Sequence, residues 1–383
     1  MSLPMAPAHA AADPYAVVRY RPEFKPQVVE LQTQLWSKSA DLNRAYFDWK
    51  YEQNPHAREP LVYLAVHEGR VVGMRGMCPL KWQAGDPPAT FLMPYADDLV
   101  VAPGHRNRGL VTRIMTTAFA DLAMRGYTHA VSLSTGQVTV LGSLAMGWKS
   151  VGPLAPLAHR GPHARATQRV RRFLYGRRLL WRLAESPLWA PRCLREPFLH
   201  LDRALRWRRG RLGRHVSGSR SPRPAEMADL VARLPYDGRI RHVREAEYFA
   251  WALRNPKQEF RFLYWSDRRL EGYLVLQRYH PAGPDDCRVN IMDWEASTPE
   301  ARRDLLHAAL RTGRFPQLAC QTLAFPGPAL TLLEDAGFTP IDVQSTARGW
   351  PALLVRPVGT GSDWTLAGRP LLDAASWDLR KLY

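Results

Sequence analysis

A short polar turn between an apolar strand and a predicted helix carries the clearest chemistry in this sequence. The strand ends at residues 97–101, which read Asp-Asp-Leu-Val-Val. The residues that lead into the helix are Arg106, Asn107, Arg108, Gly109, Leu110 and Val111. Backbone N–H groups at a helix start lack partners within the helix, and the helix dipole adds partial positive charge there. Two arginines and a glycine at this point therefore predict a site for a pyrophosphate or a similar anion.

This turn resembles the R-x-x-G-x-G/A signature of the GNAT (GCN5-related) N-acetyltransferases, although Val111 stands where the signature has Gly or Ala. In that family the turn holds the pyrophosphate of acetyl-coenzyme A, and the backbone of the preceding strand holds the pantetheine arm. The resemblance implies that backbone groups of Leu99, Val100 and Val101 act together with residues 106–111. It implies acetyl-CoA or another acyl-CoA as co-substrate, and no metal.

Acyl transfer to an amine needs proton transfer and a donor for the developing oxyanion. Asp97 and Asp98 are the candidate bases, and neighbours on a regular strand point to opposite faces, so we expect only one to face the substrate. The alternative for each is a loop cap or a pair with an arginine. The family often places an acidic Tyr five residues before its Gly-aromatic pair. The corresponding residue here, counted back from Trp148, is Ser143, which could hydrogen-bond the thiolate.

The size and charge of the chain point to more than one domain and a basic insert. The chain has 383 residues and a net charge of +18, and residues 159–223 hold 18 Arg and no Lys against three acidic residues. This segment could lie on an anionic membrane surface, bind an anionic substrate or nucleic acid, or present a solvated basic face on helices that join two domains. The sequence predicts neither a signal peptide nor a membrane span. The four scattered cysteines form no C-x-x-C pair, which favours a reducing cytoplasm over a zinc site or disulfides.

Two parts of the chain follow the same order of features. Residues 46–49 read Tyr-Phe-Asp-Trp and precede Asn54-Pro55, and residues 248–251 read Tyr-Phe-Ala-Trp and precede Asn255-Pro256. Each set is followed by a strand, a turn, a strand and later a helix. We therefore predict an α/β (α+β) protein with two tandem GNAT-like domains, each a mixed, mostly antiparallel twisted sheet flanked by helices. The predicted segments are a disordered leader (1–14), an acyl-CoA-binding domain (15–158), an Arg-rich helical insert (159–221), a degenerate second domain (222–356) and a C-terminal strap (357–383).

The second copy lacks the anion-binding turn. Glu295 and Glu300 put negative charge near the start of its helix, and Ser297 or Thr298 with Pro299 gives an ordinary capped start. We expect this copy not to bind coenzyme A. Its predicted role is to build the acceptor wall and to close the splayed edge of the first sheet.

These patterns predict an N-acyltransferase in which an amine attacks the acyl-CoA directly in a ternary complex. The aromatic Trp-Lys-Tyr segment at residues 49–51 resembles bacterial GNAT-type proteins linked to polysaccharide or cell-envelope biosynthesis, which implies a small-molecule or glycan amine, such as an amino sugar, as acceptor. One alternative is an aminoacyl-tRNA-dependent transferase of the peptidoglycan-branching type, for which the basic insert would suit tRNA. Another is a non-catalytic, membrane-associated acyl-CoA-binding protein. The predicted location is cytoplasmic, with peripheral attachment at the inner membrane face as a further option.

Overall fold

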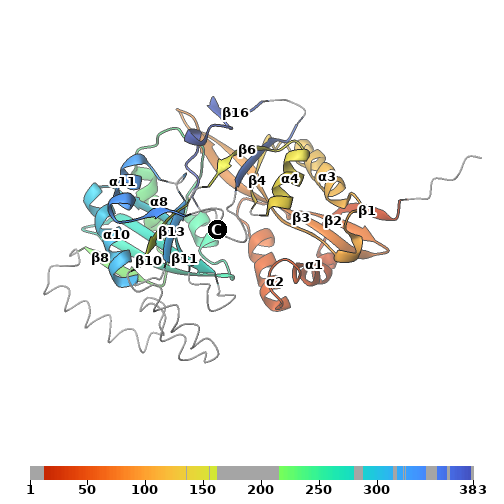
Figure 1. The fold of residues 1–383 in the computed structure, drawn as a ribbon, viewed down its shortest axis with the longest axis horizontal. Helices are drawn as coiled ribbons and strands as arrows, with labels where there is room; N and C mark the ends of the chain where they lie inside the picture. The colour runs from red at the N-terminus through yellow and green to blue at the C-terminus, as the bar shows by residue number, and fades with distance from the viewer. Residues whose placement is uncertain are drawn as a thin grey trace, which may run out of the picture.

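Two mixed sheets lie side by side in the computed structural model, each flanked by helices (Figure 1). The structure describes residues 13–134, 136–154, 156–161, 215–279, 288–313, 317–321, 323, 325–341, 352–359 and 363–380. The predicted leader lies almost wholly outside this range. So does residue range 162–214, which holds most of the Arg-rich insert, and the membrane and nucleic-acid interpretations of that insert stay predictions.

The first sheet has the strand order β1-β2-β3-β4-β5-β15-β6, and β9 pairs with β3. Its strands are β1 (Tyr15–Arg19), β2 (Leu61–His67), β3 (Arg70–Ala84), β4 (Ala89–Val101), β5 (His129–Ser134), β15 (Ala352–Pro357), β6 (Lys149–Pro153) and β9 (Arg241–His242). The helices of this half are α1 (Lys25–Gln32), α2 (Ala40–Phe47) with a π-helical extension η2 (Asp48–Glu52), α3 (Leu110–Met124) and α4 (Gln137–Ala145).

Alternating residues of β2 separate the two faces of this sheet. Val62 and Leu64 pack in the cluster that holds the buried residues of α1, α2 and η2. Leu61, Tyr63 and Ala65 pack instead in the cluster that holds the buried face of α3. A strand reverses its side chains at every residue, so this pattern places α1 and α2 on one face of the sheet and α3 on the other.

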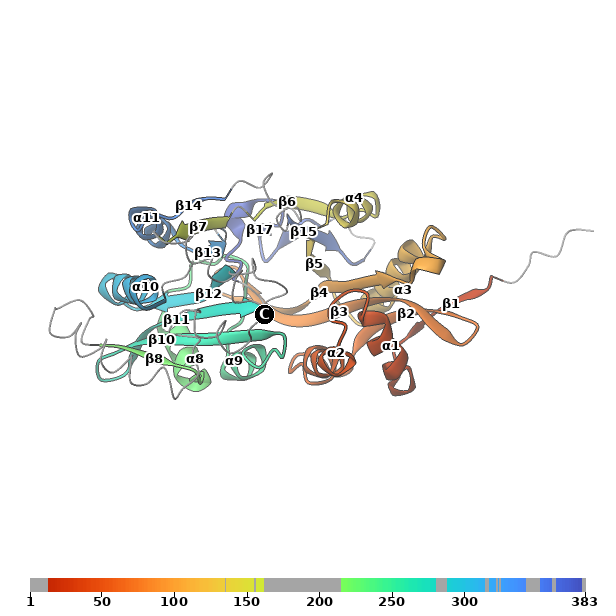
Figure 2. The same cartoon turned by 60° about the horizontal axis from the view of Figure 1, so that its bottom comes forward.

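The second sheet has the order β14-β7-β13-β12-β11-β10-β8 (Figure 2). Its strands are β14 (Thr339–Pro340), β7 (Pro156–Arg160), β13 (Gln317–Gln321), β12 (Arg288–Ala296), β11 (Leu270–Tyr279), β10 (Gln258–Ser266) and β8 (Val216–Ser219). Its helices are α8 (Pro224–Arg233), α9 (Ala246–Ala252), α10 (Pro299–Gly313) and α11 (Gly327–Asp335). The predicted fold class is confirmed: each half is a mixed sheet flanked by helices.

Strand membership departs from the predicted domain limits at β9, which joins β3, and near residue 157. The sequence suggests a single last strand of the first half running to about Leu157, but the structure has two strands there. β6 stays in the first sheet, whereas β7 pairs with β13 and β14 in the second. In return, β15 lies between β5 and β6 of the first sheet. Each sheet is thus completed by a strand from the other half of the chain.

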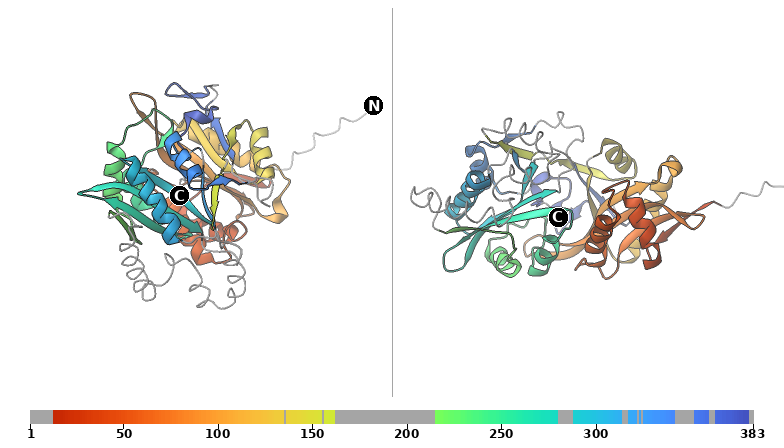
Figure 3. Two further views of the ribbon diagram at one scale, coloured as in Figure 1. Left: turned by 60° about the vertical axis from the view of Figure 1, so that its left-hand side comes forward. Right: turned by 90° about the horizontal axis from the view of Figure 1, so that it is seen from below.

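A pair of tryptophans joins the two halves at the repeated aromatic motif. The rings of Trp49 and Trp251 are stacked, with centroids 4.9 Å apart and planes 9° apart. Trp49 Nε1 donates to the Trp251 carbonyl at 2.8 Å, and Trp251 Nε1 donates to the Trp49 carbonyl at 2.7 Å. The reciprocal bonds give this contact an approximate two-fold symmetry, and Figure 3 shows the two halves side by side.

The end of the chain packs on both halves. After the hairpin of β16 (Thr365–Leu366) and β17 (Arg369–Pro370), Trp377 packs against Trp82, with ring centroids 5.9 Å apart. Leu379 N donates to the Leu323 carbonyl at 3.1 Å. Among the described residues, no helix is both long and apolar enough to cross a bilayer.

Candidate functional site

The strands β4 and β5 diverge at the point where the predicted donor strand begins. β4 pairs with β3 as far as Val101, but within the described ladder it pairs with β5 only at Tyr95 and Val131. Ser132 Oγ donates to the Ala96 carbonyl at 3.0 Å, and the ladder to β5 does not continue beyond that contact. The backbone from residue 97 to 101 therefore has a neighbouring strand on one side only.

The turn after β4 leads directly into the first turn of α3. Asn107 and Gly109 both have left-handed backbone angles, with φ of 60° and 70°. The helix begins at Leu110, two residues earlier than the sequence pattern suggests, and Arg113 N donates to the Gly109 carbonyl at 3.1 Å. No side chain caps the start of α3. Backbone N–H groups at this end are therefore oriented toward an incoming anion, with the helix dipole behind them.

The side chains of the turn are held by their neighbours. Arg106 Nε donates to the Val101 carbonyl at 3.0 Å, which ties the guanidinium to the end of β4. Arg108 Nη1 donates to the Tyr15 hydroxyl at 2.9 Å, and His105 Nδ1 lies 3.0 Å from the same oxygen. Leu110 is buried in the core beneath α3. Its side chain therefore anchors the helix, and only its backbone is placed to meet a ligand.

Asp97 and Asp98 do not point to opposite faces, contrary to the expectation for a regular strand. Lys50 Nζ donates to Asp97 Oδ2 at 2.6 Å and to Asp98 Oδ1 at 3.1 Å. Asp98 has φ of 53°, and the register between β3 and β4 shifts between Met74 and Gly76. This bulge breaks the alternation of side chains. It brings both carboxylates to one buried lysine, which forms an ion pair with each of them.

Asp98 is the more tightly bound of the two carboxylates. Besides Lys50, it accepts a hydrogen bond from Trp36 Nε1 at 3.0 Å and from the Tyr51 hydroxyl at 2.8 Å. Its side chain is fully buried, whereas that of Asp97 is 25% exposed. Gly76 makes room for this arrangement, because a β-carbon there would lie 1.8 Å from the Tyr51 hydroxyl. Asp98 is therefore a structural centre of the cluster, and Asp97 is the carboxylate that a substrate could reach.

Burial and pairing move the pKa values of this cluster in different directions. Burial raises the pKa of the Asp97 carboxyl, but the charge and hydrogen bond of Lys50 outweigh it, so the net pKa lies below its ordinary value. Burial, together with the charge of Asp97, raises the pKa of Asp98 despite Lys50. Burial lowers the pKa of Lys50, but the two carboxylates hold it well above its ordinary value. An ionised carboxylate with a depressed pKa is a weak base, so Asp97 is better suited to orient a donor group than to remove a proton.

Ser143 is engaged within its own helix. It lies in α4, where Oγ donates to the Thr139 carbonyl at 2.8 Å, and it is buried. No contact described in the structure joins Ser143 to the acidic pair. The hydrogen bond to the thiolate that the resemblance implies for Ser143 stays a prediction.

The candidate site residues predicted from the sequence do not include Lys50, Trp36 or Lys257, although Lys50 lies in the Trp-Lys-Tyr segment that carries part of the resemblance. Lys50 lies in an aromatic helical segment, and a lysine among buried aromatic residues is a signal of a buried ion pair. Lys257 comes from the second half, and its Nζ lies 3.1 Å from the centroid of the Trp36 ring. Among the described residues, no group of three or more His, Cys, Asp or Glu side chains is placed to hold a metal ion.

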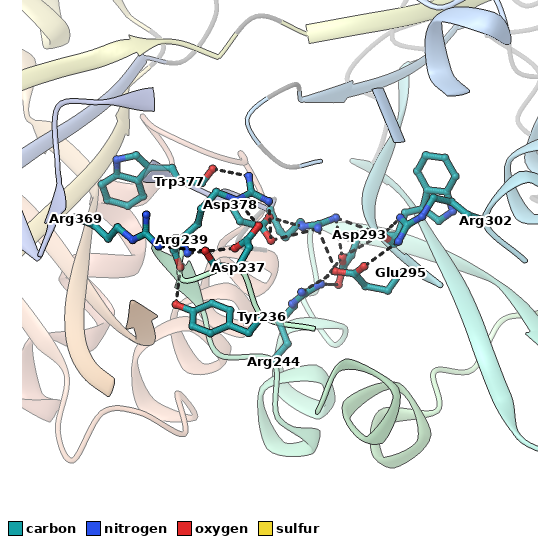
Figure 4. A network of polar contacts seen from close by, with 12 residues as sticks. Tyr236, Asp237, Arg239, Arg244, Asp293, Glu295, Arg302, Arg369, Trp377 and Asp378 are labelled. Carbon is teal, nitrogen blue, oxygen red and sulfur yellow. Dashed lines mark hydrogen bonds and ion pairs between the residues drawn. The ribbon is translucent and has the colours of Figure 1, made fainter. Parts of the chain in front are cut away.

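The corresponding strands of the second half hold a buried network of charges in place of an open turn (Figure 4). Asp293 and Glu295 on β12 accept from Arg244 at 2.9 and 2.8 Å, and Arg380 donates to Glu295 at 3.1 Å. Burial raises the pKa of Glu295, but the charges of Arg380, Arg244 and Arg302 lower it to about 2.

From the sequence, acidic charge near the start of α10 is expected to keep coenzyme A from the second half. This network points to a different reason. Glu295 presents no bare charge to the helix start, because three arginines neutralise it. The end of the chain instead fills the place where β12 and β13 part. Arg380 Nη1 donates to the Trp294 carbonyl, and Thr298 Oγ1 caps α10 by accepting from Ala301 N at 3.1 Å. The expected capped start of α10 is confirmed, with Thr298 as the cap.

Comparisons with known proteins agree with this geometry. Residues 17–142 match the family model described as an acetyltransferase (GNAT) domain. A probable N-acyltransferase from Enterococcus faecalis is similar at 12% identity with a TM-score of 0.57, over 90% of this chain and 72% of its own. A GCN5-related N-acetyltransferase from Anabaena variabilis is similar at 12% identity and a TM-score of 0.56, over 90% and 73%. A putative acetyltransferase from Pyrococcus horikoshii is similar at 10% identity and a TM-score of 0.51, over 98% and 96%. At these identities the structures show a shared fold, and no curated protein matches the sequence.

Proposed function

We propose, on the premise of the match between residues 17–142 and the GNAT acetyltransferase domain, that the protein transfers an acyl group from acyl-coenzyme A to an amine. The observation that carries the proposal is the coincidence of two features at one end of β4. The strand separates from β5 after Tyr95, and the uncapped start of α3 follows the left-handed Gly109. A thioester with a long amide-bearing arm and a pyrophosphate needs both features.

The donor binds along β4 and over the turn in this proposal. Backbone groups of Leu99, Val100 and Val101 pair with the amides of the pantetheine arm, as a further strand would. The pyrophosphate lies at the N–H groups of residues 109–111, and the exposed Arg106 and Arg108 contribute positive charge. Asn107 sets the turn through its left-handed backbone. A backbone N–H of β4 polarises the thioester carbonyl.

The acceptor approaches from the side of the acidic pair. Asp97 is partly exposed, ionised and fixed by Lys50, so it can accept a hydrogen bond from the incoming amine and orient it. Its depressed pKa argues against a role as the base, and Asp98 is enclosed by three donors. A small-molecule or glycan amine, such as an amino sugar, is the acceptor class that we propose, by analogy with the bacterial proteins that the aromatic segment resembles. Transfer from aminoacyl-tRNA is the less favoured function, because a transferase of that type would leave the turn at Gly109 without a role.

Calorimetric titration with acetyl-CoA tests the donor site. We expect wild-type protein to bind with a dissociation constant of roughly micromolar order. Gly109→Glu places a carboxylate at the pyrophosphate position, and Arg106→Ala removes a cation and the tie to Val101, so both should weaken binding at least tenfold. The matched control is Arg268→Ala, which removes an exposed arginine from the second half and should bind as wild type does. Absence of binding in the wild type would contradict the proposal.

A further inference from the structure

Lys257 reaches from the second half of the chain to the acidic cluster of the first. It lies between α9 and β10, and its Nζ is 3.1 Å from the centroid of the Trp36 ring and 4.3 Å from that of Tyr46. Trp36 uses its Nε1 to hold Asp98. A single indole therefore contacts both the lysine and the carboxylate on the donor strand. Lys257 is thereby linked through Trp36 to Asp98, the residue that precedes the part of β4 where the thioester is proposed to lie.

The local structure directs this side chain across the junction. Asn255 Oδ1 accepts from Lys257 N at 3.0 Å, which forms the same short turn that Asn54 Oδ1 makes with His56 N at 2.8 Å in the first half. The stacked tryptophans fix the segments that carry the two turns. Lys257 therefore comes from a rigid turn next to the main contact between the halves.

The charges around Lys257 differ from those around Lys50, although both lysines lie near the same acids. Lys50 donates directly to both carboxylates, which holds its pKa high. Among the described residues, none forms an ion pair with Lys257. Burial lowers the pKa of Lys257 to about 7. The charge of Asp98 opposes this shift, the charge of Lys50 adds to it, and the charge of Asp97 has the smallest, opposing effect. The facing rings of Trp36 and Tyr46 favour the charged form of the amine.

We propose that Lys257 is the group that takes the proton from the amine acceptor. In this step the neutral Lys257 amine accepts a proton from the acceptor ammonium group and becomes an ammonium. The neutral acceptor then forms the C–N bond to the thioester carbonyl, and the C–S bond breaks with the electron pair leaving on sulfur. The thiolate takes up one proton and the new amide nitrogen loses one, so the charges balance. The inference rests on the proposed acyl transfer and adds to it that the second half supplies an active-site group.

The other candidate bases are occupied by structural contacts. Asp98 is enclosed by Lys50, Trp36 and Tyr51, and Asp97 has a depressed pKa. Ser143 Oγ is bonded to its own helix. An amine that titrates near neutrality can also return its proton after transfer, which a strongly paired carboxylate cannot do efficiently.

Two variants of Lys257 separate proton transfer from charge and packing. Lys257→Arg keeps a cation on the Trp36 ring but cannot lose its proton at neutral pH. Lys257→Met keeps the length and the apolar stem without the amine. The matched control is Lys81→Met, which removes another lysine at the junction, one that pairs with Glu245 at 2.7 Å away from the acidic cluster. Acetyl-CoA binding by calorimetry should stay within about threefold of wild type in all three, which separates this inference from the donor-site proposal.

The first readout uses water and glucosamine as probe acceptors and follows the release of free thiol from acetyl-CoA. We expect Lys257→Arg and Lys257→Met to lose about 100-fold or more of the enzyme-dependent rate, in the range for a general base. The wild-type rate should rise with pH through neutrality as Lys257 loses its proton. The rate that remains in the two Lys257 variants should lack this rise, and Lys81→Met should retain both the rate and its pH profile. A wild-type rate and profile in Lys257→Arg would overturn the proposal.

The second readout needs no acceptor. Competitive labelling of the wild-type protein with a trace of acetic anhydride across pH, followed by peptide mass spectrometry, gives the titration midpoint of Lys257. A midpoint between about 6.5 and 8.5 supports the proposal. A midpoint near the ordinary lysine value of about 10.4 would overturn it, because the amine would then be charged at neutral pH.

Discussion

At the scale of single residues, the site depends on how one lysine is shared between two carboxylates. Lys50 is fully buried and joins Asp97 to Asp98. The sequence correctly predicted that both acids lie near the end of the strand that precedes the anion-binding turn. It could not show that they share a partner, because the side-chain alternation used to separate them fails at the left-handed Asp98. The contacts of Lys257 could not be predicted either, since its neighbours lie in the other half of the chain.

Replacing Lys50 should be the most destabilising single change in the cluster. Lys50→Met leaves the buried Asp98 and the partly exposed Asp97 without their cation, and removing one partner of a buried ion pair costs about 3–5 kcal/mol. The control is Lys25→Met. Lys25 also bridges two carboxylates, Asp48 and Glu52, but it is partly exposed, so the expected cost is about 0–1 kcal/mol. Urea unfolding monitored by tryptophan fluorescence measures both, and equal losses would contradict the assignment.

Lys257 should also change how the free energy of unfolding depends on pH. Its pKa falls on folding from the ordinary value of 10.5 to about 7, mainly because the side chain is buried. Between these two values the unfolded chain binds more protons than the folded protein, so this group makes the free energy of unfolding rise with pH. The rise begins near pH 7 and ends near pH 10.5. Lys257→Met should flatten this part of the profile in urea unfolding from pH 6 to 10, and an unchanged slope would count against the burial of the amine.

At the scale of elements, the turn between β4 and α3 is the feature that distinguishes the two halves. The sequence predicted the strand, the turn and the helix, and missed only that α3 begins at Leu110 rather than two residues later. It also predicted correctly that the second half has an ordinary capped helix. It could not predict that the end of the chain fills the corresponding place, because Arg380 is 85 residues from Glu295 in the sequence.

Two glycines of this turn offer a matched comparison. Gly109 has φ of 70°, while Gly104 is not left-handed, and a β-carbon would have open space at either position. Gly109→Ala should therefore cost about 1–2 kcal/mol through backbone strain alone and weaken acetyl-CoA binding. Gly104→Ala should change neither by a measurable amount. Thermal unfolding and calorimetric titration test the pair, and similar behaviour of the two variants would argue against a strained turn.

At the scale of the whole molecule, the two halves are interlocked as well as repeated. The repeat was visible in the sequence through residues such as Trp49 and Trp251. The exchange of β7 and β15 was not, because the order of strands along a chain does not fix their order across a sheet. Each half of the chain therefore contains a strand whose hydrogen-bonding partners come from the other half.

This exchange predicts that the first half does not fold alone. A fragment of residues 13–161 lacks β15, the strand that lies between β5 and β6 and pairs with both. The fragment also leaves β7 without its partner β13. It should show no cooperative unfolding transition. Co-expression with residues 215–383 should restore a soluble complex, with the transition followed by circular dichroism. A fragment that folds cooperatively by itself would contradict the interlocked arrangement.

Hydrogen–deuterium exchange with and without acetyl-CoA tests the location of the donor most directly. If the thioester lies along β4 and its pyrophosphate on the start of α3, amides within residues 97–112 should gain protection when the ligand binds. The corresponding residues 293–302 of the second half should exchange as before, because Arg380 and Arg302 already fill that place. Protection confined to the second half, or no change at residues 97–112 under saturating ligand, would contradict the proposed site.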